Sequence, residues 1–233
     1  MMKAELISCL GTDLTVVNAA RVSFDKESEW EVNHSVRKEL SAKDAALICY
    51  LAKHDHFTPF THCMITLRET VPIFVARQRF KHTIGFTYNE VSRRYVDDTP
   101  EFYLPDLWRF KADNVKQGSH YTGLTSQEVN GKLRDKEEAN GLIMSPEEIY
   151  DDCLKTYKQL LSIGVCAEQA RMVLPQSMYT SYYVTGSLSA FARAYKLRID
   201  KHAQREIQEL AEKWNAIIKD LYPVSWEALT DGK

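Results

Sequence analysis

The chain has 233 residues, a formal net charge of −2 and 27% charged side chains. A chain of this length can bury the core of one domain, and two domains are the weaker alternative. The near-neutral charge disfavours a general nucleic-acid-binding protein, which is normally basic. No apolar run of about 18 residues could span a membrane, and Met1 to Glu5 lack a secretory core. We therefore expect a cytoplasmic protein with no nucleic-acid or membrane partner.

The first half of the chain predicts a helix over 13–20, a helix over 41–54, a strand over 64–71, a helix over 72–82 and a loop over 83–92. A capping box at Ser41 opens the second helix, and alternation of apolar and polar residues marks the strand. Pro72 fits the first turn of the helix after it. Gly85 and Asn89 are typical of a loop that presents polar groups.

The second half predicts a polar surface insertion at about 111–141, a helix over 145–164, a strand over 176–185, and helices over 187–197 and 202–222. Ser145 and Pro146 provide a capping box and an N1 proline. Helices mixed with two or three strands indicate the α+β class. We expect residues 1–233 to form a single domain. The chain contains no Gly-x-Gly-x-x-Gly, which disfavours a dinucleotide-binding fold of that kind.

The five cysteines are widely separated and form no Cys-x-x-Cys pair. The odd number and the expected compartment favour reduced thiols, mostly buried. His54, His56 and His62 could suggest zinc, but no thiolate pair or His-Glu-x-x-His pattern supports such a site. We therefore expect no metal.

A basic run from Arg77 to Thr83, followed by the polar stretch from Tyr88 to Tyr95, is the best candidate for a ligand site. Arginine offers a planar fork for phosphate oxygens, and lysine adds a point charge. Side chains such as Gln78 and Ser92 can bind the edge of a base or a sugar. A solvated charged face is the alternative. Apolar residues interleave with the charges, however, which favours the wall of a cleft.

The same run resembles the signature of the flavin-dependent thymidylate synthases, which reads Arg-His-Arg and, after a short spacer, Ser. The chain has Lys81-His82-Thr83 and then Ser92, preceded by the family's Pro-Ile-Phe-Val-Ala-Arg-Gln over 72–78. The histidine and the serine match, whereas lysine and threonine replace the two arginines. Further matches are His56-Phe57-Thr58-Pro59-Phe60-Thr61-His62, Ala170-Arg171-Met172-Val173-Leu174-Pro175, the helix that begins Leu197-Arg198, and Ala20-Arg21-Val22-Ser23-Phe24.

The resemblance implies roles for individual residues and a small mixed or antiparallel sheet packed by helices. The implied dUMP ligands are Gln78, Arg79, Lys81, Glu90, Val91, Ser92, Arg93, Arg94, Arg171 and Arg198. The implied FAD ligands are Ser23, His56, Thr58, Lys81, His82, Thr83, Glu90, Ser187, Ser189, Arg193 and His202. Arg198 is the implied catalytic residue, because a fixed guanidinium stabilises negative charge on the pyrimidine ring. Structural roles remain the alternative for His82, Arg171 and His202.

The resemblance also implies an activity and an assembly. The enzyme would bind FAD, take a hydride from NADPH, and move a one-carbon unit from methylenetetrahydrofolate to dUMP, giving dTMP. The family is tetrameric, with sites built from several subunits. No cysteine of this chain lies in the Pro-Cys context of the cysteine-dependent synthases, so we expect no thiolate nucleophile.

Two alternatives remain open. The departures at Lys81, Thr83, Thr61, Ser187 and Ser189 could mark a pyrimidine nucleotide hydroxymethylase with the same fold. The missing arginine at Thr83 could instead mark a nucleotide-binding homologue without catalysis.

Overall fold

The computed structural model describes residues 1–32, 38–96, 98–113, 118–140 and 143–231, with the side chains of 136–140 left out. The chain divides into two compact units. The first unit comprises Met1–Met2, Thr70–Gln78 and Glu90–Ser181. The second unit comprises Lys3–Glu69, Arg79–Asn89 and Tyr182–Lys233. The expectation of a single domain over 1–233 stays a prediction.

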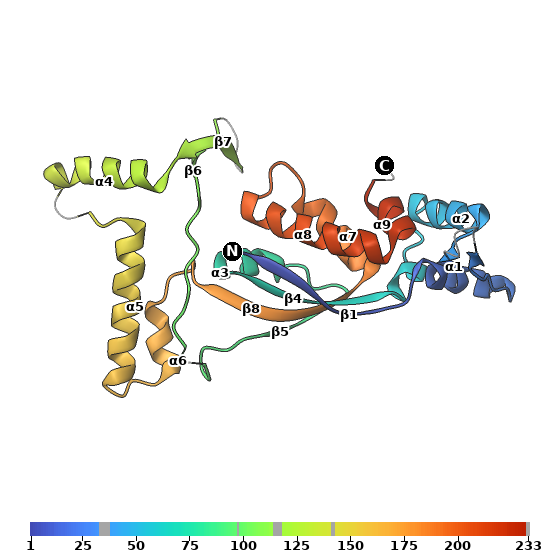
Figure 1. The fold of residues 1–233 in the computed structure, drawn as a ribbon, viewed down its shortest axis with the longest axis horizontal. Coiled ribbons are helices and arrows are strands. Elements are labelled where there is room, and N and C mark those ends of the chain that lie inside the picture. Colours follow the sequence, from blue (N-terminus) through green and yellow to red (C-terminus); the bar gives the residue numbers. More distant parts are fainter. Residues whose placement is uncertain (33–37, 97, 114–117, 141–142, 232–233) are drawn as a thin grey trace. The chain divides into compact units, whose positions relative to one another are not determined.

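A four-stranded sheet in the order β1-β4-β8-β5 is the main sheet of the protein (Figure 1). Its strands are β1 (Lys3–Leu10), β4 (Met64–Pro72), β8 (Tyr179–Ser187) and β5 (Phe86–Glu90). Hydroxyl hydrogen bonds join Thr66 to Thr185 at 3.0 Å and Thr70 to Ser181 at 3.2 Å. Residue numbers therefore rise along β4 as they fall along β8, so this pair is antiparallel.

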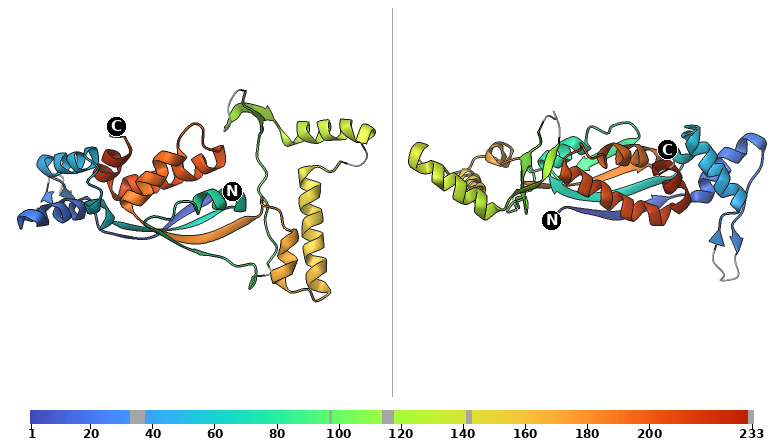
Figure 2. Two further views of the ribbon diagram at one scale, coloured as in Figure 1. Left: turned by 180° about the vertical axis from the view of Figure 1, so that it is seen from behind. Right: turned by 90° about the horizontal axis from the view of Figure 1, so that it is seen from above.

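One face of this sheet is buried. Along β4 the side chains of Ile65, Leu67 and Glu69 are fully buried, while Thr66 and Arg68 between them are not. Alternate residues of a strand point to opposite faces, so this pattern marks a sheet covered on one side. Helices α7 (Leu188–Arg198) and α8 (Arg205–Leu221) lie over the sheet in the views of Figures 1 and 2. The predicted α+β class is therefore confirmed.

The rest of the second unit is helical apart from a short antiparallel hairpin of β2 (Glu31–Val32) and β3 (Lys38–Glu39). Its further elements are α1 (Asp13–Arg21), η1 (Val22–Phe24), α2 (Ala42–Lys53), η2 (Thr58–Thr61) and α9 (Pro223–Thr230). Helix α9 packs against α2, α7 and α8, and buries Trp226. The predicted capping box at Ser41 is present in part, since the Ser41 hydroxyl accepts from the Asp44 backbone N–H.

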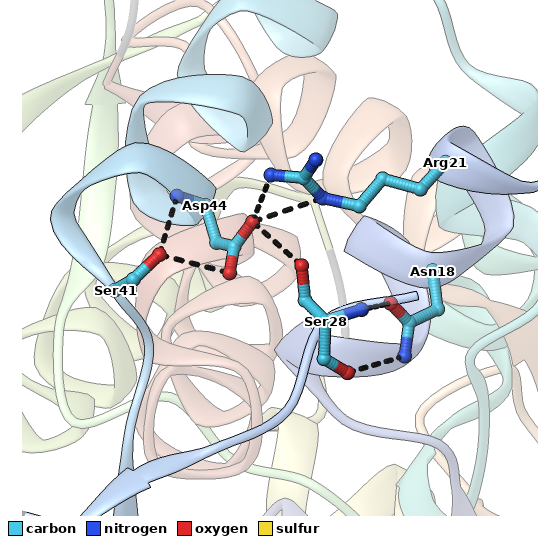
Figure 3. Close-up of polar contacts among 5 residues, drawn as sticks. All are labelled: Asn18, Arg21, Ser28, Ser41 and Asp44. Atoms are coloured by element: carbon cyan, nitrogen blue, oxygen red, sulfur yellow. Dashed lines mark hydrogen bonds and ion pairs between the residues drawn. The ribbon is translucent and has the colours of Figure 1, made fainter. Parts of the chain in front are cut away.

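A buried carboxylate joins α1 to α2 (Figure 3). Asp44 accepts hydrogen bonds from Nε and an Nη of Arg21, from the Ser28 hydroxyl at 3.0 Å and from the Ser41 hydroxyl at 2.9 Å. Asn18 in turn bonds the backbone of Ser28 through both atoms of its amide. Burial opposes ionisation of Asp44, but the hydrogen bonds from Arg21, Ser41 and Ser28 outweigh it and lower its pKa.

The first unit holds the segment between β5 and β8. Its elements are most of α3 (Ile73–Arg79), the antiparallel pair β6 (Trp108–Lys111) and β7 (Ser119–Leu124), α4 (Ser126–Asn140), α5 (Pro146–Ser162), α6 (Ala167–Ala170) and η3 (Arg171–Val173). The capping box predicted at Ser145 is complete, because Ser145 and Glu148 exchange hydrogen bonds. The insertion predicted at about 111–141 contains a strand and a helix of its own. Within it, residues 114–117 and 141 lie outside the described chain.

Several predicted boundaries were wrong. Helix α3 ends at Arg79 rather than His82, because the His82 N–H closes a turn onto the Arg79 carbonyl at 3.1 Å and the Tyr88 hydroxyl donates to the His82 carbonyl at 2.7 Å. The segment 83–92, predicted as a loop, contains strand β5. The Phe86 ring of this strand packs against Gly186 so closely that a Cβ added there would lie 2.4 Å from the ring. The last long helix begins at Arg205 rather than at His202.

The described cysteines are all free, but most are not buried as predicted. Cys9, Cys49 and Cys166 are exposed, and only Cys63 is buried. Within the residues that the structure describes, no helix is long and apolar enough to cross a membrane. The same residues contain no cluster of His, Cys, Asp and Glu that could hold a metal ion.

Candidate functional site

The second unit contains a buried ion pair that includes Arg79 of the basic run 77–83. Arg79 and Glu69 are both fully buried, and Nε of Arg79 lies 3.3 Å from a carboxylate oxygen of Glu69. The Tyr182 hydroxyl donates to the same carboxylate at 2.6 Å. Nη1 of Arg79 donates to the Tyr88 hydroxyl at 2.7 Å. A buried guanidinium with these partners stabilises the core. The sequence predicted Arg79 as a nucleotide ligand, but the structure does not present it to a ligand.

Aromatic rings surround the remainder of the Arg79 guanidinium. Its carbon lies 4.3 Å from the ring centre of Phe86 and 4.5 Å from that of Trp214, with Tyr88 and Phe191 slightly farther away. One Nη has no hydrogen-bond partner among the residues that the structure describes. The faces of these rings carry partial negative charge and offset part of the cost of burying the cation.

His82 and Arg198, predicted from opposite ends of the sequence, are in direct contact. Nε of Arg198 donates a hydrogen bond to Nε2 of His82 at 2.8 Å. His82 is only 8% exposed, and its backbone carbonyl accepts from the Tyr88 hydroxyl at 2.7 Å. Because Nε2 accepts, a neutral His82 carries its proton on Nδ1.

The electrostatics of this contact favour a neutral imidazole. Burial lowers the pKa of His82 to about 4, and the positive charges of Arg198, Arg79 and Arg193 act in the same direction. Burial, with a contribution from Arg79, also lowers the pKa of Arg198. An arginine remains charged under such a shift. The pair therefore joins a permanent cation to an uncharged acceptor at neutral pH.

A second group of predicted residues meets at the start of α7. Ser187 caps this helix by accepting from the Ala190 N–H, and its hydroxyl lies 3.2 Å from that of Ser189. The backbone N–H of Ser187 donates to the Gly85 carbonyl at 3.3 Å. Arg193 donates to the carbonyl of Ile84. The turn that follows Lys81-His82-Thr83 is therefore fixed against α7.

The other residues predicted to bind a flavin are mostly exposed. Ser23 lies in η1, His56 precedes η2, and Thr58 begins η2, which packs against α7. Lys81 and Thr83 are exposed on either side of His82. Nδ1 of His202 lies 3.0 Å from the Asp200 carboxylate, in the turn before α8.

The first unit holds most of the residues predicted to bind a nucleotide. Gln78 is half-buried at the end of α3, and Glu90 accepts from the Thr180 hydroxyl at 2.7 Å. Val91 is exposed and donates its N–H to the Ser181 carbonyl at 2.9 Å. The Ser92 hydroxyl accepts from the Arg94 N–H at 3.3 Å, while Arg93 binds the carbonyl and carboxylate of Asp98.

Glu168 brings two predicted arginines together in this unit. Nε of Arg94 lies 3.0 Å from the Glu168 carboxylate, and Nε of Arg171 donates to its carbonyl at 3.2 Å. Glu168 was not among the predicted site residues, although it lies three residues before Arg171 on a helical segment, a spacing at which side chains are neighbours. Nor were Glu69 and Tyr88, which no local pattern marks.

The comparisons with known proteins agree with the motifs. The sequence profile of the family described as Thy1, Thymidylate synthase complementing protein, matches residues 5–224. The chain belongs to the Thy1 family. The flavin-dependent thymidylate synthase of Thermosipho melanesiensis is 40% identical over 96% of this chain and 88% of its own length. That of Thermus thermophilus is 36% identical over 97% of this chain and 74% of its own length.

Similarity to a solved structure supports the fold. The UMP/dUMP methylase PolB of Streptomyces cacaoi, bound with 5-Br dUMP, is similar with a TM-score of 0.78 at 30% identity, covering 99% of this chain and 95% of that chain. The predicted Thy1-type fold is therefore confirmed, and the relatives confirm that this chain is an enzyme of the flavin-dependent thymidylate synthase kind.

Cys63 is the buried cysteine among those that the structure describes. Burial raises the pKa of Cys63 to about 12, with a further contribution from the charge of Asp13. Its thiol donates to the carbonyl of Thr12 at 3.4 Å. A thiol held protonated in this way is a poor nucleophile.

Proposed function

We infer that this protein is a thymidylate synthase that methylates dUMP to dTMP, with methylenetetrahydrofolate as carbon donor and NADPH as reductant through FAD. The observation that carries this proposal is the contact of Arg198 with His82 in a Thy1 chain. In this contact a permanent guanidinium meets a neutral partner, and Arg198 belongs to the stretch that resembles the family's Leu-Arg motif. Such a donor stabilises negative charge as it develops on a pyrimidine ring.

The donor set of the second unit fits a flavin nucleotide. Exposed Lys81 can pair with phosphate oxygens, and the hydroxyls of Thr58 and Thr83 can bond phosphate or ribose. The turn at Gly85 (φ +80°) lies so close to α7 that an added Cβ would be 2.9 Å from the Cβ of Ala190. When bound, FAD supplies the two-electron chemistry between NADPH and the transferred carbon. The proposed FAD ligands are Ser23, His56, Thr58, Lys81, Thr83, Glu90, Ser187, Ser189, Arg193 and His202.

The polar groups of the first unit fit a nucleotide monophosphate. Arg94 and Arg171 provide cationic forks, and Gln78 and Ser92 can bond a base or sugar. The proposed dUMP ligands of this unit are Gln78, Glu90, Val91, Ser92, Arg93, Arg94 and Arg171, and those of the second unit are Lys81 and Arg198. The overall stoichiometry follows from electron balance. NADPH provides the two electrons that convert the methylene to a methyl group, so the folate leaves as tetrahydrofolate.

The proposal includes a homotetramer. Large apolar side chains stand exposed on the second unit, including Val22 at 70% and Phe24 at 76%. Exposed apolar groups of this size often mark association surfaces, and these flank Ser23, a proposed flavin ligand. Light scattering should give four copies at micromolar concentration. A stable monomer that retains activity would contradict this part of the proposal.

Product analysis tests the reaction. The purified protein should be yellow and release FAD on denaturation. With dUMP, methylenetetrahydrofolate and NADPH it should form dTMP and tetrahydrofolate in equal amounts. If reconstitution with FAD gives neither a spectral change nor binding heat, the proposed function is wrong.

A second substrate, UMP, is favoured by one observation. The solved relative is described as a UMP/dUMP methylase and was also crystallised with 5-Br UMP. Assaying both nucleotides side by side, with mass analysis of the product, separates a dUMP enzyme from one that accepts ribose. The same measurement separates methylation from hydroxymethylation, because the two products differ by one oxygen atom.

A further inference from the structure

We propose that His82 is a positioning residue that orients the Arg198 guanidinium by accepting a hydrogen bond from its Nε. This inference rests on the proposed function, in which Arg198 acts on the pyrimidine ring. The histidine at the centre of Lys81-His82-Thr83 thereby has a hydrogen-bond partner within the same chain, Arg198.

The geometry of the contact fixes the guanidinium plane. The bond of 2.8 Å is donated by Nε, the atom at the root of the guanidinium, and the acceptor belongs to a residue that is only 8% exposed. A hydrogen bond at Nε restricts rotation about the last bonds of the arginine side chain. Arginine otherwise has many rotamers to lose on binding, so this restriction favours catalysis.

The position of His82 is itself fixed by a chain of hydrogen bonds that runs into the core. Its carbonyl accepts from Tyr88 at 2.7 Å, and Tyr88 accepts from Nη1 of Arg79 at 2.7 Å. Arg79 is bound to Glu69, which also accepts from Tyr182 at 2.6 Å. Each member of this chain is buried or half-buried in the second unit. Arg198 is thereby tied to the buried face of the sheet.

Histidine suits this role because it can accept at Nε2 while remaining uncharged. A protonated imidazole has no acceptor and would repel Arg198. A carboxylate would accept, but its charge would neutralise the guanidinium that the reaction uses. Among uncharged substitutes, a glutamine amide reaches the position of Nε2, whereas an asparagine amide reaches only that of Nδ1.

The test compares His82→Gln, His82→Asn and His82→Leu with the parent enzyme. We expect His82→Leu and His82→Asn to lower kcat for dUMP on the order of 10- to 100-fold. His82→Gln should recover most of the loss. The Kd for FAD, measured separately by fluorescence titration, should stay within about threefold in all variants. His120→Leu, at an exposed histidine of the first unit, is the matched control and should behave like the parent.

A double-mutant cycle shows whether His82 acts through Arg198. In an Arg198→Ala background, His82→Leu should cause no further loss of kcat or of dUMP affinity measured by calorimetry. Additive losses would overturn the proposal. So would equal activities of the Gln and Leu variants, or a fall in FAD affinity that accounts for the lost activity.

The controls separate this inference from the proposed function. If the parent enzyme forms no methylated nucleotide, the proposed function fails first. If the parent is active and His82→Leu is equally active, only the positioning role fails. Should His82→Leu not fold, the Gln and Asn pair decides the question, because both amides are polar and similar in size to the imidazole.

Discussion

Arg198 and His82 are separated by 116 residues in sequence, yet a hydrogen bond of 2.8 Å joins Nε of one to Nε2 of the other. The first ends helix α7, and the second follows the turn after α3. Two stretches that the sequence marks as independent motifs are therefore parts of one hydrogen-bonded structure. Removing either partner should therefore affect the other.

Arg198→Ala should lower kcat on the order of 10²- to 10³-fold while leaving FAD bound, because it removes a donor aimed at developing negative charge. Arg198→Lys should restore little, since an ammonium lacks the planar fork and has no Nε to bond His82. Single-turnover rates with dUMP, alongside FAD content from absorbance, measure both effects. Parent-like turnover by Arg198→Ala would show that the assignment of the catalytic residue is wrong.

Arg79→Met should destabilise the protein by about 3–5 kcal/mol, because it leaves the Glu69 carboxylate buried without its cation. Arg79→Met combined with Glu69→Gln should recover part of this loss. Urea unfolding followed by circular dichroism measures both. Arg205→Met, in an exposed pair with Glu209, is the control, and a change of less than about 0.5 kcal/mol is expected there. A loss confined to dUMP affinity would instead make Arg79 a ligand.

Stability should fall between about pH 6.5 and pH 4 in a way that depends on His82. The folded protein holds the pKa of His82 at about 4, under the influence of burial and of Arg198, Arg79 and Arg193. The unfolded chain takes up that proton from about pH 6.5, so the unfolded state binds more protons in this window and is favoured as the pH falls. The loss in the free energy of unfolding is on the order of 3 kcal/mol at its full extent.

His82→Gln removes this titration. The stability difference between the parent and the variant should therefore be constant above about pH 6.5 and move in favour of the variant below it. Thermal unfolding midpoints measured from pH 4 to pH 8 give the comparison. Parallel curves over the whole range would contradict a buried neutral His82.

Cys63 should be chemically inert in the folded protein. It is buried, with a pKa raised to about 12, whereas Cys9, Cys49 and Cys166 are exposed. A thiol reagent should label these three well before Cys63, as read by mass spectrometry of peptides. Cys63→Ala should leave kcat within about threefold, because no step needs a thiolate. Loss of dTMP formation without unfolding would point to a cysteine nucleophile.

Asp44→Ala should cost about 1–3 kcal/mol, because it leaves Arg21 and the hydroxyls of Ser28 and Ser41 without their acceptor. The pKa of Asp44 is lowered in the folded protein. The carboxylate therefore adds to the free energy of unfolding above the pKa that Asp44 has in the unfolded chain, and this stabilisation is lost as the pH falls. The destabilisation should therefore shrink in acid. Asp152→Ala, in an exposed pair with Lys155, should change stability little.

Local sequence signals predicted those helices and strands that are determined by residues close together in the chain. The complete capping box of Ser145 with Glu148 is an example, since its residues lie within one turn of each other. The alternation along Met64–Val71 correctly predicted a strand with one buried face. The ordered motifs were sufficient to identify the Thy1 family, because their residues and order recur in the relatives.

Roles within the basic run could not be predicted in the same way. Arg77, Arg79 and Lys81 look alike in sequence, yet Arg79 is fully buried while its two neighbours are exposed. The difference depends on Glu69, Tyr88, Phe191 and Trp214, which come from four separate elements. The strand β5 was likewise missed, because its pairing with β8 is a long-range interaction and its own composition is typical of a loop.

The sequence by itself therefore determined the family, the α+β class and the helix starts at Ser41 and Ser145, since each depends on residue identity or on neighbours within a few positions. Only the tertiary structure decided that Arg79 neutralises a buried carboxylate and that His82 accepts from Arg198. The charge state and partner of a buried group depend on which distant segments exclude water around it. That information is absent from any local stretch of the chain and arises only when β4, β5, β8, α7 and α8 pack together.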